Sequence, residues 1–128
     1  MARRVSIHIP GFSHENPIPA ASRIGQHLSS GVLTGRDPQT GAMAEGLDAQ
    51  MAVVFGHIRA LMTAAGGSTD NILKLTFWLA DYRDRDALNR EWLAMFPDAS
   101  SRPARQVVAA QLDGGALVHA DLVAVLAD

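Results

Sequence analysis

The chain contains no cysteine, and this absence removes several kinds of chemistry at once. Disulfide bonds, thiolate nucleophiles, zinc ribbons and iron–sulfur clusters all depend on cysteine, so none of them is available here. Lysine is scarce as well, because Lys74 is the only one, and the net charge is -2 with no run of basic residues. Since nucleic-acid binding needs a concentrated basic surface, we expect no nucleic-acid partner.

Long apolar runs are also missing, and none approaches the roughly 20 residues that a membrane-spanning helix needs. Residues 1–4 precede a short alternating segment rather than the apolar core of a signal peptide. We therefore expect no membrane partner and, by default, a cytoplasmic protein. The length of 128 residues, with 48% hydrophobic and 19% charged residues, indicates one globular domain over residues 1–128.

Motifs for phosphate loops, dinucleotides and serine hydrolases are absent. The adjacent His14 and Glu15 resemble part of a zinc-binding helix, but the second histidine is missing. Pro17 and Pro19 exclude a helix there and indicate an ordered loop. We expect no metal site.

Residue periodicity predicts five strands and two helices in the order strand, strand, helix, strand, helix, strand, strand. The strands are expected at residues 5–9, 24–33, 71–79, 104–112 and 116–126, and the helices at 47–62 and 81–96. Right-handed crossovers would place both helices on the same face of one mixed sheet. Met51 and Met62 are expected in the core, and His57, beside the apolar stripe, on the helix surface.

The last two strands are predicted to form a hairpin around the turn Asp113-Gly114-Gly115. Its final strand alternates cleanly, so one face should be core and the other should carry a histidine and an acid among apolar residues. The core face comprises Val118, Ala120, Leu122, Ala124 and Leu126, and the other face Leu117, His119, Asp121, Val123 and Val125.

The sheet face without helices would be strongly apolar. The residues expected there are Ile72, Trp78, Val107, Leu117, Val123 and Val125. This is too much apolar surface to leave in water. We therefore expect a homo-oligomer in which sheet faces meet, with Arg105, His119 and Asp121 near a subunit boundary.

Three residues could act on a small carboxylate-bearing metabolite. Arg105, stiffened by the preceding Pro103, offers a donor fork for a carboxylate, and Gly31 could present its backbone N–H to a ligand. His119 could move a proton near neutral pH. Structural alternatives stay open, namely an ion pair between Arg105 and Asp121, a buried interface role for His119, and a strand bulge at Gly31.

Several short motifs occur in a characteristic order: Ser-Ser-Gly at the end of the second strand, Asp-Pro-Gln-Thr-Gly at residues 37–41, Leu88-Asn89, and Pro-Ala-Arg at 103–105. With these motifs and the elements between them, nearly the whole chain resembles the RidA/YjgF family of enamine and imine deaminases, once called endoribonuclease L-PSP. The resemblance implies an α+β, chorismate-mutase-like fold and a homotrimer with sheets at its centre and clefts between subunits. It also implies hydrolysis of 2-imino or 2-enamino acids to 2-keto acids and ammonia without a cofactor.

The resemblance assigns Arg105 to carboxylate binding, Gly31 to a backbone contact with substrate, and Asn89 to the pocket. The position of the family's water-positioning glutamate is matched by His119, or by Ala120 if the gap is placed differently, which leaves His119 and Asp121 as candidate catalytic residues. Val107 stands where these deaminases often have a cysteine, and the loop around His14 and Asn16 replaces a segment that usually supplies a tyrosine. Two alternatives follow: a carboxylate-binding protein without catalysis, or the RNA cleavage and translation inhibition attached to relatives, which the acidic balance disfavours.

Overall fold

The computed structural model of the chain describes residues 3–12 and 16–127, and within them one mixed sheet of six strands packs against two helices. The strands are β1 (Arg4–Ile7), β2 (Ala21–Ile24), β3 (His27–Ser30), β4 (Ile72–Leu79), β5 (Ala104–Ala109) and β6 (Val118–Val125). The helices are α1 (Leu47–Ala64) and α2 (Arg85–Met95), and a short 3-10 helix, η1 (Thr69–Asn71), precedes β4. His14 and Glu15 lie outside the described residues.

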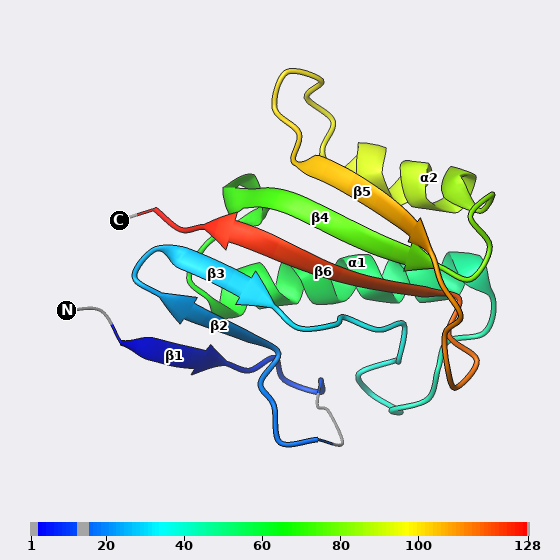
Figure 1. Ribbon diagram of the computed structural model, residues 1–128, viewed down its shortest axis with the longest axis horizontal. Helices are drawn as coiled ribbons and strands as arrows, with labels where there is room; N and C mark the ends of the chain where they lie inside the picture. The colour runs from blue at the N-terminus through cyan, green and yellow to red at the C-terminus, as the bar shows by residue number, and fades with distance from the viewer. Residues whose placement is uncertain (1–2, 13–15, 128) are drawn as a thin grey trace.

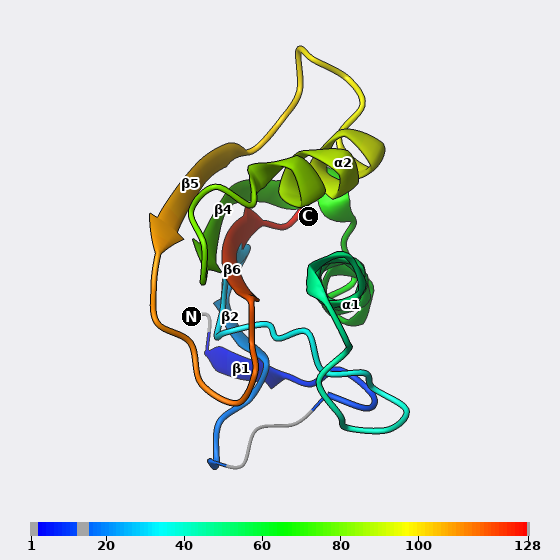
Figure 2. The same cartoon turned by 90° about the vertical axis from the view of Figure 1, so that its right-hand side faces the viewer.

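The strands lie side by side in the order β1-β2-β3-β6-β4-β5. Strand β5 runs parallel to β4, and all the other neighbouring strands are antiparallel. Figure 1 looks onto the uncovered face of the sheet, and Figure 2 shows α1 and α2 together on the opposite face. This arrangement confirms the predicted α+β fold with both helices on one face of a mixed sheet.

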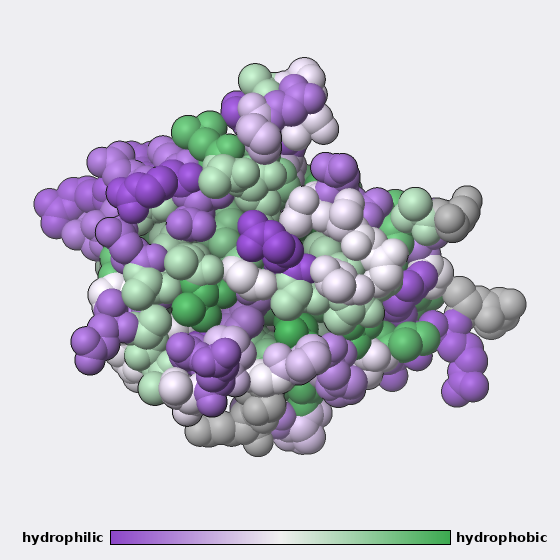
Figure 3. Space-filling view, turned by 180° about the vertical axis from the view of Figure 1, so that it is seen from behind, coloured by the Kyte–Doolittle hydropathy of each residue, from purple (hydrophilic) through white to green (hydrophobic). Residues whose placement is uncertain are grey.

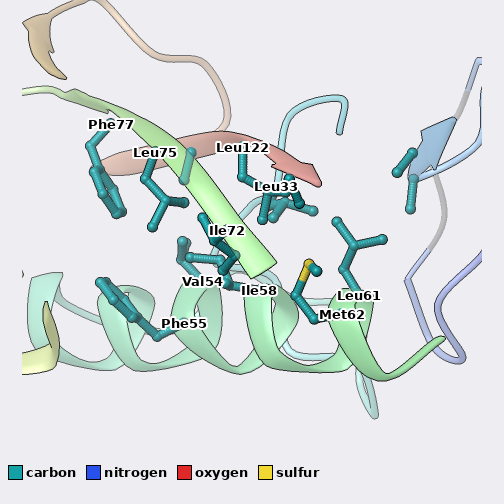
Figure 4. Close-up of a cluster of buried hydrophobic side chains, with 14 of the residues drawn as sticks. Leu33, Val54, Phe55, Ile58, Leu61, Met62, Ile72, Leu75, Phe77 and Leu122 are labelled. Atoms are coloured by element: carbon teal, nitrogen blue, oxygen red, sulfur yellow. The ribbon is translucent and has the colours of Figure 1, made fainter. Parts of the chain in front are cut away.

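The helix α1 forms where the sequence predicts it, because apolar residues recur at helical spacing from Leu47 onward. Met51 and Met62 are fully buried, as expected of core residues. The helix ends before Gly66, whose φ of +80° is a conformation that residues with a side chain rarely adopt. Figure 4 shows apolar side chains from α1 meeting those of β4 and β6. Among the described residues, no helix is long and apolar enough to cross a membrane.

The segment predicted as one strand over residues 24–33 is two strands. The chain reverses at Gly25 and Gln26, so that β2 and β3 pair as an antiparallel hairpin. Gly25 has a φ of +58°, which a two-residue hairpin turn beginning with glycine requires. The predicted single strand was therefore wrong, and the turn adds the sixth strand to the sheet.

The predicted hairpin between the last two strands is also wrong. Strand β4 lies between β5 and β6 and pairs with both. Residues 110–117 instead cross over the end of β4, where Ala110 donates its N–H to the carbonyl of Leu79 and Ala80 donates to that of Leu117. The two strands are consecutive in the sequence but not adjacent in the sheet. Of these last two strands, β6 has the predicted alternation of buried and more exposed residues.

The faces of β4 and β5 differ in part from those predicted. A register shift between Ile72 and Lys74 turns Ile72 into the core and leaves Leu73 59% exposed. Val107 pairs in register with the buried Phe77 and faces the helices. Two of the six residues predicted on the uncovered face therefore lie on the helix side. Trp78, Val123 and Val125 stay on the uncovered face, whereas Leu117 lies outside β6, just before its first residue.

His57 is buried rather than on the surface of α1. Only 3% of the residue is exposed, and its ring packs edge-on against Phe12 with ring centres 4.8 Å apart. Nδ1 donates to the carbonyl oxygen of Thr34 at 2.9 Å, whereas Nε2 is buried with no hydrogen-bond partner. Burial lowers the pKa of His57, although the hydrogen bond to Thr34 and the charge of Asp37 act in the opposite direction. The prediction of a surface histidine was wrong.

Candidate functional site

Arg105 lies on β5, the edge strand, and its side chain points to the helix side of the sheet because it pairs in register with Leu75. Nη1 of Arg105 donates to Oδ1 of Asn89 on α2 at 2.8 Å. The guanidinium carbon lies 5.0 Å from the centre of the Trp92 ring. Arg105 and Asn89, two of the predicted substrate-binding residues, are therefore in contact within one chain. The ring of Trp92 forms a flat surface beneath the arginine.

Among the residues that the structure describes, no carboxylate forms an ion pair with the Arg105 guanidinium. In the described part of the chain, the arginines paired with carboxylates are Arg83 and Arg90. Burial lowers the pKa of Arg105, and the positive charge of Arg85 lowers it further. A partly desolvated cation of this kind favours an anion beside it, since charge-assisted hydrogen bonds replace the lost hydration. The geometry therefore suits a bound carboxylate.

His119 and Asp121 lie on β6 but on the uncovered face of the sheet, opposite to Arg105. His119 pairs in register with Trp78, and Asp121 with Thr76. The predicted alternative of an ion pair between Arg105 and Asp121 is therefore wrong, because the sheet separates the two side chains. One chain alone does not place these residues around one small molecule.

The environment of the uncovered face shifts the titration of both candidate catalytic groups. Burial lowers the pKa of His119, and the charge of Asp113 opposes this shift. Burial raises the pKa of Asp121, with Lys74 acting in the opposite direction. His119 is consequently neutral near pH 7 and can accept a proton.

Gly31 follows β3 directly, and its N–H donates to the carbonyl oxygen of Ala20 at 2.9 Å. The pairing of this segment with β6 resumes at Leu33, with one residue more on this side than on β6, as in a bulge. Added at Gly31, a Cβ would make only ordinary contacts, the nearest at 3.7 Å. Its role beside a substrate stays a prediction.

Gln50 is a buried polar residue that no motif or spacing in the sequence singles out. Its Nε2 donates to the carbonyl oxygens of Ala44 and Gly115, both at 3.1 Å, and its Oε1 accepts from the N–H of Leu117 at 2.7 Å. This side chain ties α1 to the segment that leads into β6. It therefore helps to fix the strand that carries His119.

The described residues hold no group of three or more histidine, aspartate or glutamate side chains that could bind a metal ion. The candidate site is accordingly built from one arginine, one asparagine and an aromatic surface, with a histidine and a carboxyl group on the far side of the sheet.

Comparison with known proteins gives a consistent result. The profile of the family described as Endoribonuclease L-PSP matches residues 20–126. A RutC family protein of Aquifex aeolicus is 34% identical over 110 residues, which cover 85% of this chain and 88% of that protein. The 2-iminobutanoate/2-iminopropanoate deaminase of Salmonella typhimurium is 34% identical over 89 residues, which cover 66% of this chain and 70% of the deaminase.

Solved structures give the same fold. RidA from an Antarctic Psychrobacter superposes with a TM-score of 0.88 at 27% identity, covering 95% of this chain and 99% of that one. YyfA of Yersinia pestis, a Rid family protein, has a TM-score of 0.90 at 24% identity, covering 97% of this chain and all of that one. The chain belongs to the RidA/YjgF family, which is also described as the endoribonuclease L-PSP family.

Proposed function

We propose that the protein hydrolyses small 2-imino and 2-enamino acids to 2-keto acids and ammonia. The observation that carries this proposal is the Arg105 guanidinium, which is oriented by Asn89, supported by Trp92 and without a carboxylate partner among the described residues. The name of the Salmonella relative, a 2-iminobutanoate/2-iminopropanoate deaminase, supports the same class of substrate.

Arg105 would bind the substrate carboxylate. A guanidinium presents parallel N–H donors that match the two oxygens of a carboxylate, so the substrate is held in one orientation. Nη1 is already directed by Asn89, which limits rotation of the side chain before the ligand arrives. The imino carbon, adjacent to the bound carboxylate, is thereby fixed relative to Arg105.

The base would come from a second copy of the chain. Within one chain the sheet lies between Arg105 and His119, so neither side chain can reach a substrate bound at the other. The uncovered face still carries apolar residues, and Val123 and Val125 are 38% and 37% exposed. In a trimer, the β5 edge of one copy would lie against the uncovered face of the next, which would bury these valines and bring His119 of one copy toward Arg105 of another.

His119 would then activate a water molecule. Water attacks the imino carbon, and His119 Nδ1 or Nε2 takes a proton from it. The ring then returns this proton to the substrate nitrogen, and the C–N bond of the tetrahedral adduct breaks, so that ammonia leaves and the 2-keto acid remains. Because burial lowers the pKa of His119, the ring is in its basic form at neutral pH. Asp121, two residues further along the same face, is the alternative proton acceptor.

One observation favours a second function, the binding of a carboxylate metabolite without turnover. Arg105, Asn89 and Trp92 form a complete anion site within one chain, whereas a base is not part of it. In that case small carboxylates would raise the melting temperature through Arg105, but no ammonia would be released.

The deciding experiment is the hydrolysis of freshly generated 2-iminopropionate and 2-aminoacrylate by the wild type and by Arg105→Ala. We expect catalysis by the wild type above the uncatalysed rate, and its loss in the variant. Light scattering should give the same oligomer for both proteins. Turnover that is unchanged in Arg105→Ala would refute the proposal, and absence of turnover in both would leave the binding function as the better account.

A further inference from the structure

Arg85 stands one helical turn before Asn89 on α2. Residues four apart lie on the same face of a helix, one above the other. Asn89 contacts Arg105, so this face of α2 is turned toward β5. Arg85 therefore belongs to the row of side chains on the face of α2 that is turned toward β5.

The directions of the two elements place Arg85 beyond Arg105 along the line where α2 faces β5. The helix α2 runs opposite to β5, as Figure 1 shows, so the step from Asn89 back to Arg85 goes the same way as the step from Arg105 to Val107. Each step covers roughly 6 Å. Val107 is the next residue of β5 on the helix side and packs against the core. Arg85 thus lies opposite Val107, one step beyond the contact between Arg105 and Asn89.

Electrostatics and contacts agree with this placement. Burial, and after it the charge of Arg85, lowers the pKa of Arg105, in agreement with the position of Arg85 one turn before Asn89 on α2. The guanidinium of Arg85 lies 4.6 Å from the centre of the Tyr82 ring, in the way that Arg105 lies over Trp92. No carboxylate in the described residues forms an ion pair with either of them. Figure 3, which shows the helix side, has hydrophilic side chains gathered at the end where α2 begins.

Two like charges held close together without counter-ions are unfavourable unless an anion joins them. We propose that Arg85 is a second anion-binding residue of the site and that the preferred substrates are 2-imino acids with a second carboxylate on the side chain. This inference rests on the proposed function, because it takes the first carboxylate to be bound by Arg105.

The proposal predicts that imines with an apolar side chain and imines with a second carboxylate are hydrolysed with different efficiency. The imines of alanine and of 2-aminobutanoate have an apolar side chain, which would lie against Val107 and leave Arg85 in water. The imines of aspartate and glutamate have a carboxylate at the end of the side chain, which would reach toward Arg85. A charge-assisted hydrogen bond is strong enough to change the preference for a substrate by roughly tenfold or more.

The test compares hydrolysis of 2-iminosuccinate with that of 2-iminopropionate. Each imine is released from its amino acid by an oxidase, and its hydrolysis is followed as the loss of imine captured by semicarbazide. For the wild type we expect a higher kcat/KM on 2-iminosuccinate. Arg85→Gln should lower the ratio of the two kcat/KM values about tenfold, mainly through KM for the dicarboxylate. Arg90→Gln is the matched control on the same helix, since Arg90 pairs with Asp48 instead, and it should leave the ratio unchanged.

A wild-type preference for 2-iminopropionate, or an equal loss on both imines in Arg85→Gln, would overturn the proposal. If the wild type hydrolyses neither imine, the proposed function fails, and calorimetry still decides the role of Arg85. In the calorimetric titrations, 2-oxoglutarate should bind to the wild type more tightly than 2-oxobutanoate. Arg85→Gln should abolish this difference in affinity. Equal affinities of the wild type for the two keto acids would exclude a second anion-binding residue.

Discussion

Arg105 and Asn89 are joined by a hydrogen bond of 2.8 Å from Nη1 to Oδ1, although they come from an edge strand and a helix 16 residues apart in the sequence. The bond uses one donor of the guanidinium and leaves the others to face a ligand. It therefore orients the arginine without neutralising it, which is what a carboxylate site requires.

This relationship predicts different effects for two substitutions of Asn89. Asn89→Ala removes one hydrogen bond from Arg105 and should raise KM for an imino acid several-fold. Asn89→Asp should raise KM further, because its carboxylate would pair with Arg105 and compete with that of the substrate. Steady-state kinetics of both variants on one imine tests this order. An Asn89→Asp enzyme with the KM of the wild type would show that Arg105 does not bind the substrate carboxylate.

The proton acceptor predicts a pH dependence of activity. His119 must be neutral to accept a proton, and burial lowers its pKa, so kcat/KM should fall only below the ordinary histidine value of about 6.5. Because the charge of Asp113 opposes the shift, Asp113→Asn should move this fall in kcat/KM, the acid limb of the pH profile, to still lower pH. The control is His119→Gln, whose small residual activity should show no such fall. An unaltered limb in that variant would point to Asp121 instead.

The buried His57 predicts a pH dependence of stability. Its pKa is lowered in the folded protein, so between that value and about 6.5 the unfolded chain binds more protons than the folded one. The free energy of unfolding should consequently be highest above pH 6.5 and fall as the pH falls toward the lowered pKa. Urea unfolding of the wild type and of His57→Gln across this range measures the effect. The variant should lose less stability on acidification, and identical slopes would contradict the assignment.

Gln50 predicts a stability effect remote from the anion site. In Gln50→Leu the buried N–H of Leu117 and the carbonyls of Ala44 and Gly115 lose their partners. We expect the free energy of unfolding to fall by about 2–4 kcal/mol. Gln111→Leu, at an exposed position, should change it by less than about 0.5 kcal/mol. Similar values for the two variants in chemical denaturation would mean that the Gln50 bonds contribute little.

Local periodicity predicted much of this fold. The alternation from Val118 to Leu126 gave the faces of β6 correctly, and the helical spacing from Leu47 gave α1. These patterns depend on neighbours in the sequence, which is why they could be interpreted from the chain alone. A single extra residue at Leu73 was enough to reverse the expected faces at the start of β4, because successive side chains of a strand alternate.

Strand order was the part that the sequence did not reveal. Consecutive strands are neighbours in most sheets, but here β4 separates β5 from β6. The error placed Arg105 on the same face as Asp121, whereas the two lie on opposite faces. The sequence named Arg105, Asn89 and His119, yet it could not tell which of them share a face. It also gave no sign that Trp92 supports Arg105, since at helical spacing a tryptophan indicates only core.

The central claim is that an imine is hydrolysed at a site to which Arg105 comes from one chain and His119 from another. The most direct measurement mixes Arg105→Ala and His119→Ala subunits after unfolding and refolds them together. If two chains form each site, random mixing of equal amounts restores both side chains at about a quarter of the sites. The account predicts that 2-iminopropionate hydrolysis, nearly absent in each variant alone, returns to about that fraction of the wild-type rate. A mixture that stays as inactive as its components would contradict it.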